Sequence, residues 1–296
     1  MIARPCQKQN IHGVRLVVSD AVFPARGDAP RTGHSISWVP LVPSIPPSSA
    51  AQVQAPLRGS VSIPGGTSMA QHALVLATLA VGRTRIRGVP DCSEIRAVAA
   101  VLRELGATIL VQEDGVWVVD GVGVGGLREP DTVLDLGCAA SAIPLLLGML
   151  ATHPITAIVT GDATLRCQRV NSFAHPLSLF GASFISREGD FLPLAVRGSL
   201  HPLPIDDRAP DASVKTAMLL AALNTPGRSS VIEAQPSGDR FENLLRCFGV
   251  TLDIEELGDG SRRSSLDGQS ELSPADLDLL DDPSVAADSP GLGANH

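Results

Sequence analysis

The chain has 296 residues, a formal net charge of −8, and a composition that is 44% hydrophobic but only 3% aromatic, with no tyrosine. Its length suffices for one large domain or two small ones, and small aliphatic side chains favour α/β layers over an aromatic-rich sandwich. Every apolar run is shorter than the roughly 18 residues that span a bilayer. With no signal-peptide pattern and no basic-aromatic pattern, the sequence predicts a cytoplasmic protein that binds neither membranes nor nucleic acid.

Both ends of the chain are predicted to lie outside the folded core. Residues 1–52 include the proline- and serine-rich run SWVPLVPSIPPSSAAQ, which predicts a flexible extension. The net charge is −9 from Asp253 onward and therefore +1 before it. This acidic composition predicts a disordered tail over residues 257–296, with at most a short helix that Ser273 would cap.

Residues 53–256 contain an internal repeat of about 70 residues. Apolar helix blocks recur at 74–80, 145–151 and 218–224, and each follows a loop of small residues and precedes a strand. A second helix and a strand pair complete the first two units, whereas the third ends within its strand pair. The pattern predicts an α/β domain of three βαβαββ units around buried helices. The helix starts near Ser68, Ser141 and Ser213 are then expected on one face.

The first of these helix starts, in the stretch PGGTSMAQHALVLATLA over residues 64–80, resembles an anion-binding loop. Free backbone N–H groups and the helix dipole suit a phosphate or carboxylate there. Ser68 either donates to such an anion or bonds a free N–H of its own helix. His72 is the first basic side chain, and it is either a protonated anion ligand or a half-buried helix histidine.

Two other motifs are open to competing interpretations. The run GVGVGG at 121–126 matches a dinucleotide fingerprint, but Pro130 breaks the helix that such a fingerprint must open. We therefore predict a glycine turn and no cofactor. The five cysteines have no C-x-x-C spacing, which predicts neither disulfides nor a metal site. Cys138, at a helix start, is either a nucleophile or an inert small residue.

The repeat and its loop motifs resemble the enolpyruvyl (carboxyvinyl) transferases. Within that family, the 5-enolpyruvylshikimate-3-phosphate synthases (3-phosphoshikimate 1-carboxyvinyltransferases) are the most similar. The resemblance rests on these pieces in order: LRGSVSIPGGTS, LVLATLAVGRTRIRGVPDCSEIRAVAAVLRELGA, LDLGCAASAIPLLLGML, TGDATLR, HPLSLFGA, ASVKTAMLLAALNTPG and SGDRFENLLRCFG. It implies carboxyvinyl transfer from phosphoenolpyruvate to shikimate 3-phosphate or a related alcohol. Such enzymes have two similar domains with the substrates in the cleft between them.

The resemblance also implies a set of substrate-binding positions, several of which differ from the family pattern. The family's Lys-Ser pair and following Arg correspond to Thr67, Ser68 and His72. Its Asn-Ala-Gly-Thr motif and Arg correspond to Cys138, Ala139, Ala140, Ser141 and Pro144. The remaining candidates are Gln168 and Arg169, Asp211 and Ser213 in place of the family's Ser-Ala-Gln loop, and the bases Arg166, Lys215 and Arg240. These bases form either a residual positive rim or ordinary ion pairs.

The altered positions lead to two hypotheses about function. In the first, the chain is a carboxyvinyl transferase that is impaired as a single chain, because donor binding needs fixed cations and proton transfer needs a placed acid and base. In the second, it is a non-catalytic homologue that binds an anion or a partner, or a truncated gene product. The family's second domain is expected to lie outside this sequence, so a partner chain or self-association would cover the helix-start face.

Overall fold

The computed structural model describes residues 66–238 and 240–279. The predicted extension, the boundary at residue 53 and the last 17 residues lie outside the described residues. Within the described part, no helix is both long and apolar enough to cross a membrane.

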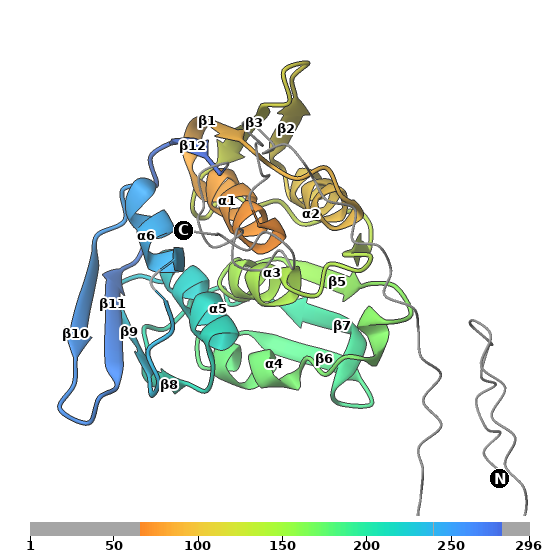
Figure 1. Ribbon diagram of the computed structural model, residues 1–296. Coiled ribbons are helices and arrows are strands. Elements are labelled where there is room, and N and C mark those ends of the chain that lie inside the picture. The colour runs from red at the N-terminus through yellow and green to blue at the C-terminus, as the bar shows by residue number, and fades with distance from the viewer. Residues whose placement is uncertain (1–65, 239, 280–296) are drawn as a thin grey trace, which may run out of the picture. The chain divides into compact units, whose positions relative to one another are not determined.

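The elements follow the predicted repeat (Figure 1). The first unit contains α1 (Thr67–Leu79), β1 (Val81–Arg87), α2 (Ser93–Glu104), β2 (Thr108–Val111) and β3 (Trp117–Val122). The second contains β4 (Leu134–Asp135), α3 (Ala142–Ala151), β5 (Thr156–Thr160), the 3₁₀ turn η1 (Leu165–Cys167), α4 (Asn171–Ser178), β6 (Ser183–Arg187) and β7 (Phe191–Arg197). The third contains β8 (Asp206–Ala209), α5 (Ala212–Leu223), β9 (Arg228–Glu233), α6 (Arg240–Cys247), β10 (Leu252–Glu256) and β11 (Arg262–Asp267), followed by β12 (Asp276–Asp278).

The three sheets share one topology. Their strand orders are β12-β1-β3-β2, β4-β5-β7-β6 and β8-β9-β11-β10. In each, the first two strands in that order pair in parallel and the others pair antiparallel. The α/β class with βαβαββ units is thus confirmed. Strand β12 occupies in the first sheet the place that β4 and β8 hold in the others.

The prediction of disorder from residue 257 onward is wrong for residues 257–279. Strand β11 pairs with both β9 and β10, which completes the third unit. Its arginines face acidic neighbours, with Arg263 within 3.7 Å of Glu255, and its Ser264 and Leu266 are buried. Cross-strand opposite charges stabilise such a strand, so the acidic composition was misleading.

The helix expected after Ser273 is also absent from the described residues, because β12 lies there instead. Pro274 has no backbone N–H, and the next residues bond to β1: Arg85 N donates to Ala275 O at 3.2 Å. Leu279 N donates in turn to Arg87 O at 3.0 Å. The folded core therefore extends to Leu279 rather than ending at residue 256.

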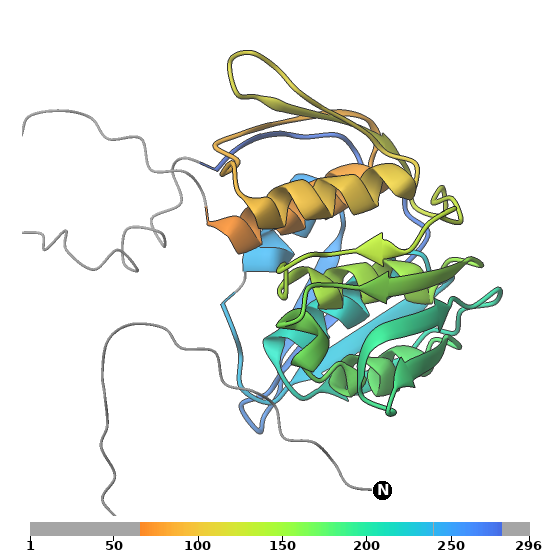
Figure 2. The same ribbon diagram turned by 90° about the vertical axis from the view of Figure 1, so that its right-hand side faces the viewer.

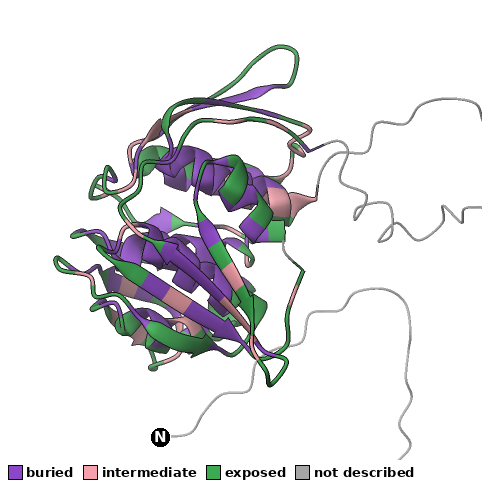
Figure 3. Ribbon diagram, turned by 90° about the vertical axis from the view of Figure 1, so that its left-hand side faces the viewer, coloured by how far each residue is buried: buried purple, intermediate pink, exposed green. Residues whose placement is uncertain are grey.

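The core is built around α1, α3 and α5, which lie at the centre with the sheets around them (Figures 1 and 2). All ten residues of α3 are buried, as expected for a helix that is apolar on every face. Figure 3 shows that buried residues gather in the interior of the fold, whereas exposed residues lie on the outer strands and loops. Gly148 permits the close approach of α3 and α5, because a Cβ there would lie 2.5 Å from the carbonyl O of Ala217. This close packing places the starts of the central helices near one another.

The glycine turn predicted at 121–126 is confirmed, since β3 leads into a loop rather than a helix. Gly123 and Gly125 have φ of 82° and 83°, which L side chains rarely adopt. Gly125 N donates to His153 Nε2 at 3.1 Å, and His153 Nδ1 lies 2.6 Å from Met149 O. Burial lowers the pKa of His153, so this turn is held by a neutral imidazole.

Candidate functional site: the pocket at three helix starts

The helices α1, α3 and α5 begin around one pocket of about 230 Å³. We call it the helix-start pocket; its lining residues are Ser68, His72, Ser141, Pro144, Ala212, Ser213 and Thr216. The expectation that Ser68, Ser141 and Ser213 share one face is confirmed. All three serines are exposed, so their polar atoms are accessible to a ligand.

The start of α1 offers hydrogen-bond donors. Gly66 is the N-cap, and no side chain among residues 66–238 and 240–279 caps the N–H groups of the first turn. Ser68 is exposed in that turn and Thr67 is half-buried. An uncapped helix start with a hydroxyl beside it can donate to an oxyanion.

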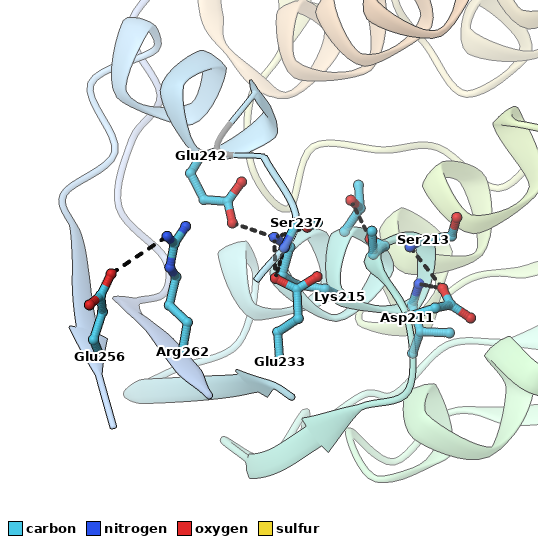
Figure 4. Close-up of polar contacts among 11 residues, drawn as sticks. Asp211, Ser213, Lys215, Glu233, Ser237, Glu242, Glu256 and Arg262 are labelled. Atoms are coloured by element: carbon cyan, nitrogen blue, oxygen red, sulfur yellow. Dashed lines mark hydrogen bonds and ion pairs between the residues drawn. The ribbon is translucent and has the colours of Figure 1, made fainter. Parts of the chain in front are cut away.

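The start of α5 differs, because the chain's own carboxylate occupies it (Figure 4). Asp211 Oδ1 accepts from Ser213 N at 2.8 Å and from Val214 N at 2.9 Å. This is the usual capping contact of an N-cap aspartate. The N–H groups that an anion would use at this end are therefore already bonded, and a negative charge stands beside them.

His72 is a neutral wall of the pocket rather than a cation. The residue is half-buried, and its ring packs on that of Phe241 with centroids 5.3 Å apart. Burial lowers the pKa of His72 to about 4, since the charged imidazolium loses hydration there. The hypothesis that a protonated His72 replaces the family's arginine is therefore wrong at neutral pH.

Lys215 is not part of a positive rim, because its side chain is buried. The next residue in the sequence, Thr216, lines the pocket. Only 3% of Lys215 is exposed. Its Nζ lies 3.0 Å from Glu233 Oε2 and 2.7 Å from Glu242 Oε1, and it donates to Ser237 Oγ at 2.8 Å (Figure 4). We call these four residues the Lys215 cluster. The cation of α5 thus forms ion pairs with two buried carboxylates instead of facing a ligand.

Within this cluster, opposing effects act on Glu233. Burial raises the pKa of its carboxyl, but hydrogen bonds from Ser237 and the charge of Lys215 outweigh burial, so the pKa lies below its usual range. Ser237 N donates to Glu233 Oε2 at 2.9 Å, which contributes to this stabilisation of the ionised form. The cluster therefore holds Glu233 in its ionised form, while Glu242 contacts the cluster through its ion pair with Lys215.

The other predicted bases and polar residues lie on the surface away from the pocket lining. Arg166, Gln168, Arg169 and Arg240 are exposed, and none of them lines the helix-start pocket. Arg169 Nε lies 3.2 Å from Asp190 Oδ2. Among the described residues, no lysine or arginine lines this pocket. Exposed Cys138 has Ser93 Oγ 3.6 Å from its Sγ, a weak hydrogen-bonding neighbour rather than a base.

Sequence reasoning missed Thr216 and Gln71, and it named Pro144 only as the position of the family's arginine. Pro144 is tolerated in the first turn of α3, where N–H groups lack intrahelical partners, and it presents an apolar wall. Thr216 adds its hydroxyl to those of the three serines in the pocket lining. Gln71 is fully buried: its Oε1 accepts from Ser141 Oγ at 2.7 Å, and its Nε2 donates to Glu94 Oε2 at 3.5 Å. An amide within an otherwise apolar helix was the available indication of Gln71.

With this geometry established, comparison with known proteins identifies the family. A family model described as EPSP synthase (3-phosphoshikimate 1-carboxyvinyltransferase) matches residues 51–289. The chain belongs to this family. The 3-phosphoshikimate 1-carboxyvinyltransferase of Rhodospirillum rubrum is 47% identical over 254 residues, which cover 83% of this chain and 56% of the relative. That of Acidiphilium cryptum is 43% identical over 243 residues, covering 81% and 54%.

Solved structures agree with the family assignment. An EPSP synthase from Acinetobacter baumannii superposes with a TM-score of 0.68 at 30% identity, covering 74% of this chain and 49% of the other. The chain spans about half the length of the curated relatives it matches. The EPSP synthase family resemblance read from the loop motifs is thus confirmed.

Proposed function

We propose that the helix-start pocket is part of a carboxyvinyl-transfer site, where a hydroxyl of shikimate 3-phosphate or a related alcohol receives the carboxyvinyl group of phosphoenolpyruvate. The observation that carries this proposal is the convergence of Ser68, Ser141 and Ser213 at one pocket in a member of the EPSP synthase family. The ligand class is a small phosphorylated or carboxylated molecule. The start of α1 suits its anionic group.

The same geometry argues against turnover by this chain alone. Transfer forms a C–O bond, releases phosphate and moves protons, so it needs fixed cations and a placed acid and base. In the described residues, the pocket has a neutral His72, an apolar Pro144 and an Asp211 that caps its own helix. We propose that residues of a partner chain, or of a second copy across the exposed helix starts, complete the site.

The test is a titration and a turnover assay on the purified full chain. Shikimate 3-phosphate is titrated with and without phosphoenolpyruvate, and phosphate release is followed with both present. We expect binding of shikimate 3-phosphate and no turnover. Turnover above about 1 per second by the unaltered chain, an ordinary enzyme rate, would overturn the proposed impairment.

A double variant sharpens the test. Thr67→Lys with His72→Arg places two cations at the start of α1, so anion affinity should rise, by roughly tenfold or more for charge-assisted hydrogen bonds. Turnover should remain absent, because neither change supplies an acid or base. Recovery of turnover by this variant would show that cations alone were missing.

The second candidate is a non-catalytic homologue that binds an anion or a partner. The observation that favours it is Asp211, whose carboxylate takes the N–H groups at the start of α5. Binding of shikimate 3-phosphate without turnover, even when a separately expressed second half of a relative is added, would support this candidate. Turnover on such addition would support the transferase.

A further inference from the structure

Three hydroxyls lie on the α3 and α5 sides of the helix-start pocket, and those of Ser141 and Thr216 have already used their protons, whereas the exposed Ser213 hydroxyl can still donate. Thr216 Oγ1 donates to Ala212 O at 2.9 Å, and Ser141 Oγ donates to Gln71 Oε1 at 2.7 Å. A hydroxyl has one proton and two lone pairs. Both oxygens therefore present only lone pairs to the pocket.

The direction of the Ser141 hydrogen bond follows from Glu94, which contacts Gln71, the partner of Ser141. The carboxylate of Glu94, half-buried on α2, only accepts hydrogen bonds, and the Gln71 amide has an NH₂ end and an oxygen end. With Nε2 3.5 Å from Glu94 Oε2, the NH₂ end faces the carboxylate and Oε1 is left for Ser141. The reverse orientation would bring two acceptors together around a fully buried amide, which is costly.

Apart from the Ser213 hydroxyl, the side chains that line the pocket in the described residues add no donor to this side. No lysine or arginine of the described residues lines the pocket, and His72 is neutral above pH about 4. Asp211 adds a carboxylate at the start of α5. Ser141 and Thr216 therefore act as acceptors in this pocket, and donors lie at the start of α1.

We propose that Ser141, in the helix-start pocket, accepts a hydrogen bond from the ligand, given by a hydroxyl or an ammonium group. Ser141 is the specificity-determining contact, and Gln71 and Glu94 are positioning residues that set the polarity of Ser141. This deepens the proposed function, on which it rests for the choice of substrate. A hydroxyl of the alcohol substrate lies against Ser141, and its anionic group lies toward Ser68.

The first test needs no ligand. In the full chain, NMR of the Gln71 side-chain amide should show its NH₂ protons close to Glu94 and distant from the Ser141 methylene. In Glu94→Gln the amide loses this constraint, so contacts to Ser141 should appear. Glu104→Gln, which removes another carboxylate from α2, is the matched control and should change nothing. NH₂ protons next to Ser141 in the unaltered chain would overturn the proposal.

The second test compares two probes. Shikimate 3-phosphate carries hydroxyls and an anion, whereas sulfate is an anion that donates nothing. Ser141→Ala should weaken shikimate 3-phosphate by about 2- to 12-fold, the range for one neutral hydrogen bond, and leave sulfate unchanged. Ser141→Thr keeps a hydroxyl, so it should retain the affinity for shikimate 3-phosphate. Glu94→Gln should weaken shikimate 3-phosphate and leave sulfate unchanged or tighter, which a merely structural role would not do.

The outcomes separate the inference from the proposed function. If Ser141→Ala weakens sulfate, then Ser141 donates to anions and the inference is wrong. If shikimate 3-phosphate fails to bind the unaltered chain, the proposed function fails, while the amide orientation at Gln71 still decides the inference. Equal weakening of both probes by Glu94→Gln would also contradict the positioning role.

Discussion

The helix-start pocket and the Lys215 cluster are neighbours on α5, yet they use charge in opposite ways. Thr216 lines the pocket, whereas the preceding Lys215 is 3% exposed and contacts two carboxylates. In the cluster, every contact joins groups of the chain itself. In the pocket, Ser68 and the first-turn N–H groups of α1 have no capping side chain within the described part of the chain, so they can still bind a ligand. A cation that is adjacent to a site in the sequence can therefore stabilise the fold instead of binding a ligand.

The largest expected effect is on stability, from Lys215→Met. Removing the ammonium leaves Glu233 and Glu242 buried without their cation, which should lower the free energy of unfolding by about 3–5 kcal/mol. Urea unfolding at pH 7 measures this. Arg96→Met removes a cation whose partner Asp91 is exposed, so it should hardly change stability. Equal effects of the two variants would contradict the division between the regions.

The next largest effect concerns the pocket and depends on pH. The pKa of His72 is about 4 in the folded chain, below its ordinary value of 6.5, so the unfolded chain binds the proton more readily. The free energy of unfolding therefore falls as the pH drops from 6.5 to 4, by up to about 3 kcal/mol from this group. Above pH 6.5 the group contributes no pH dependence.

The variant His72→Gln tests this contribution. Urea unfolding of both proteins at pH 7 and pH 4.5 should show a smaller loss for the variant. Because burial also lowers the pKa of His153, the parent chain keeps some pH dependence in either case. Identical losses in parent and variant would mean that His72 is hydrated in the folded chain.

A smaller effect is expected at the start of α5. Asp211→Ala removes the cap from Ser213 N and Val214 N and should cost about 1 kcal/mol of unfolding free energy. It also removes the negative charge at that edge of the pocket, so sulfate should bind more tightly. Asp211→Asn keeps a capping oxygen and should retain most of the stability. A weaker affinity for sulfate in Asp211→Ala would contradict the view that this carboxylate opposes anions.

The smallest effect on stability is expected for Ser68→Ala. The hydroxyl is exposed at an uncapped helix start, so the free energy of unfolding should change by no more than about 0.5 kcal/mol. Sulfate binding, measured by calorimetry, should weaken by roughly tenfold, as expected for a charge-assisted hydrogen bond. A large loss of stability with unchanged sulfate binding would place Ser68 with the scaffold instead.

The repeat and the convergence of the helix starts were predictable, because they depend on local patterns that occur three times. The state of His72 was not predictable, since Phe241 comes from another unit and no local pattern announces it. The same holds for Lys215, whose partner Glu242 lies on α6. Composition also misled at β11, where Arg262 and Arg263 form ion pairs with acidic residues of the neighbouring strand β10. Long-range pairing thus decided what local sequence left open.

Because β1 pairs with β12, the sheet that contains β1 needs residues from both ends of the described part of the chain. Ala275 N donates to Thr84 Oγ1 across a separation of 191 positions in the chain. The sheet β4-β5-β7-β6, by contrast, needs only residues 134–197. Contacts of such long range slow folding, because the loop must close before they are formed. During synthesis on the ribosome, the sheet β4-β5-β7-β6 can therefore be completed first. The sheet that contains β1 can be completed only after residue 278 has been synthesised.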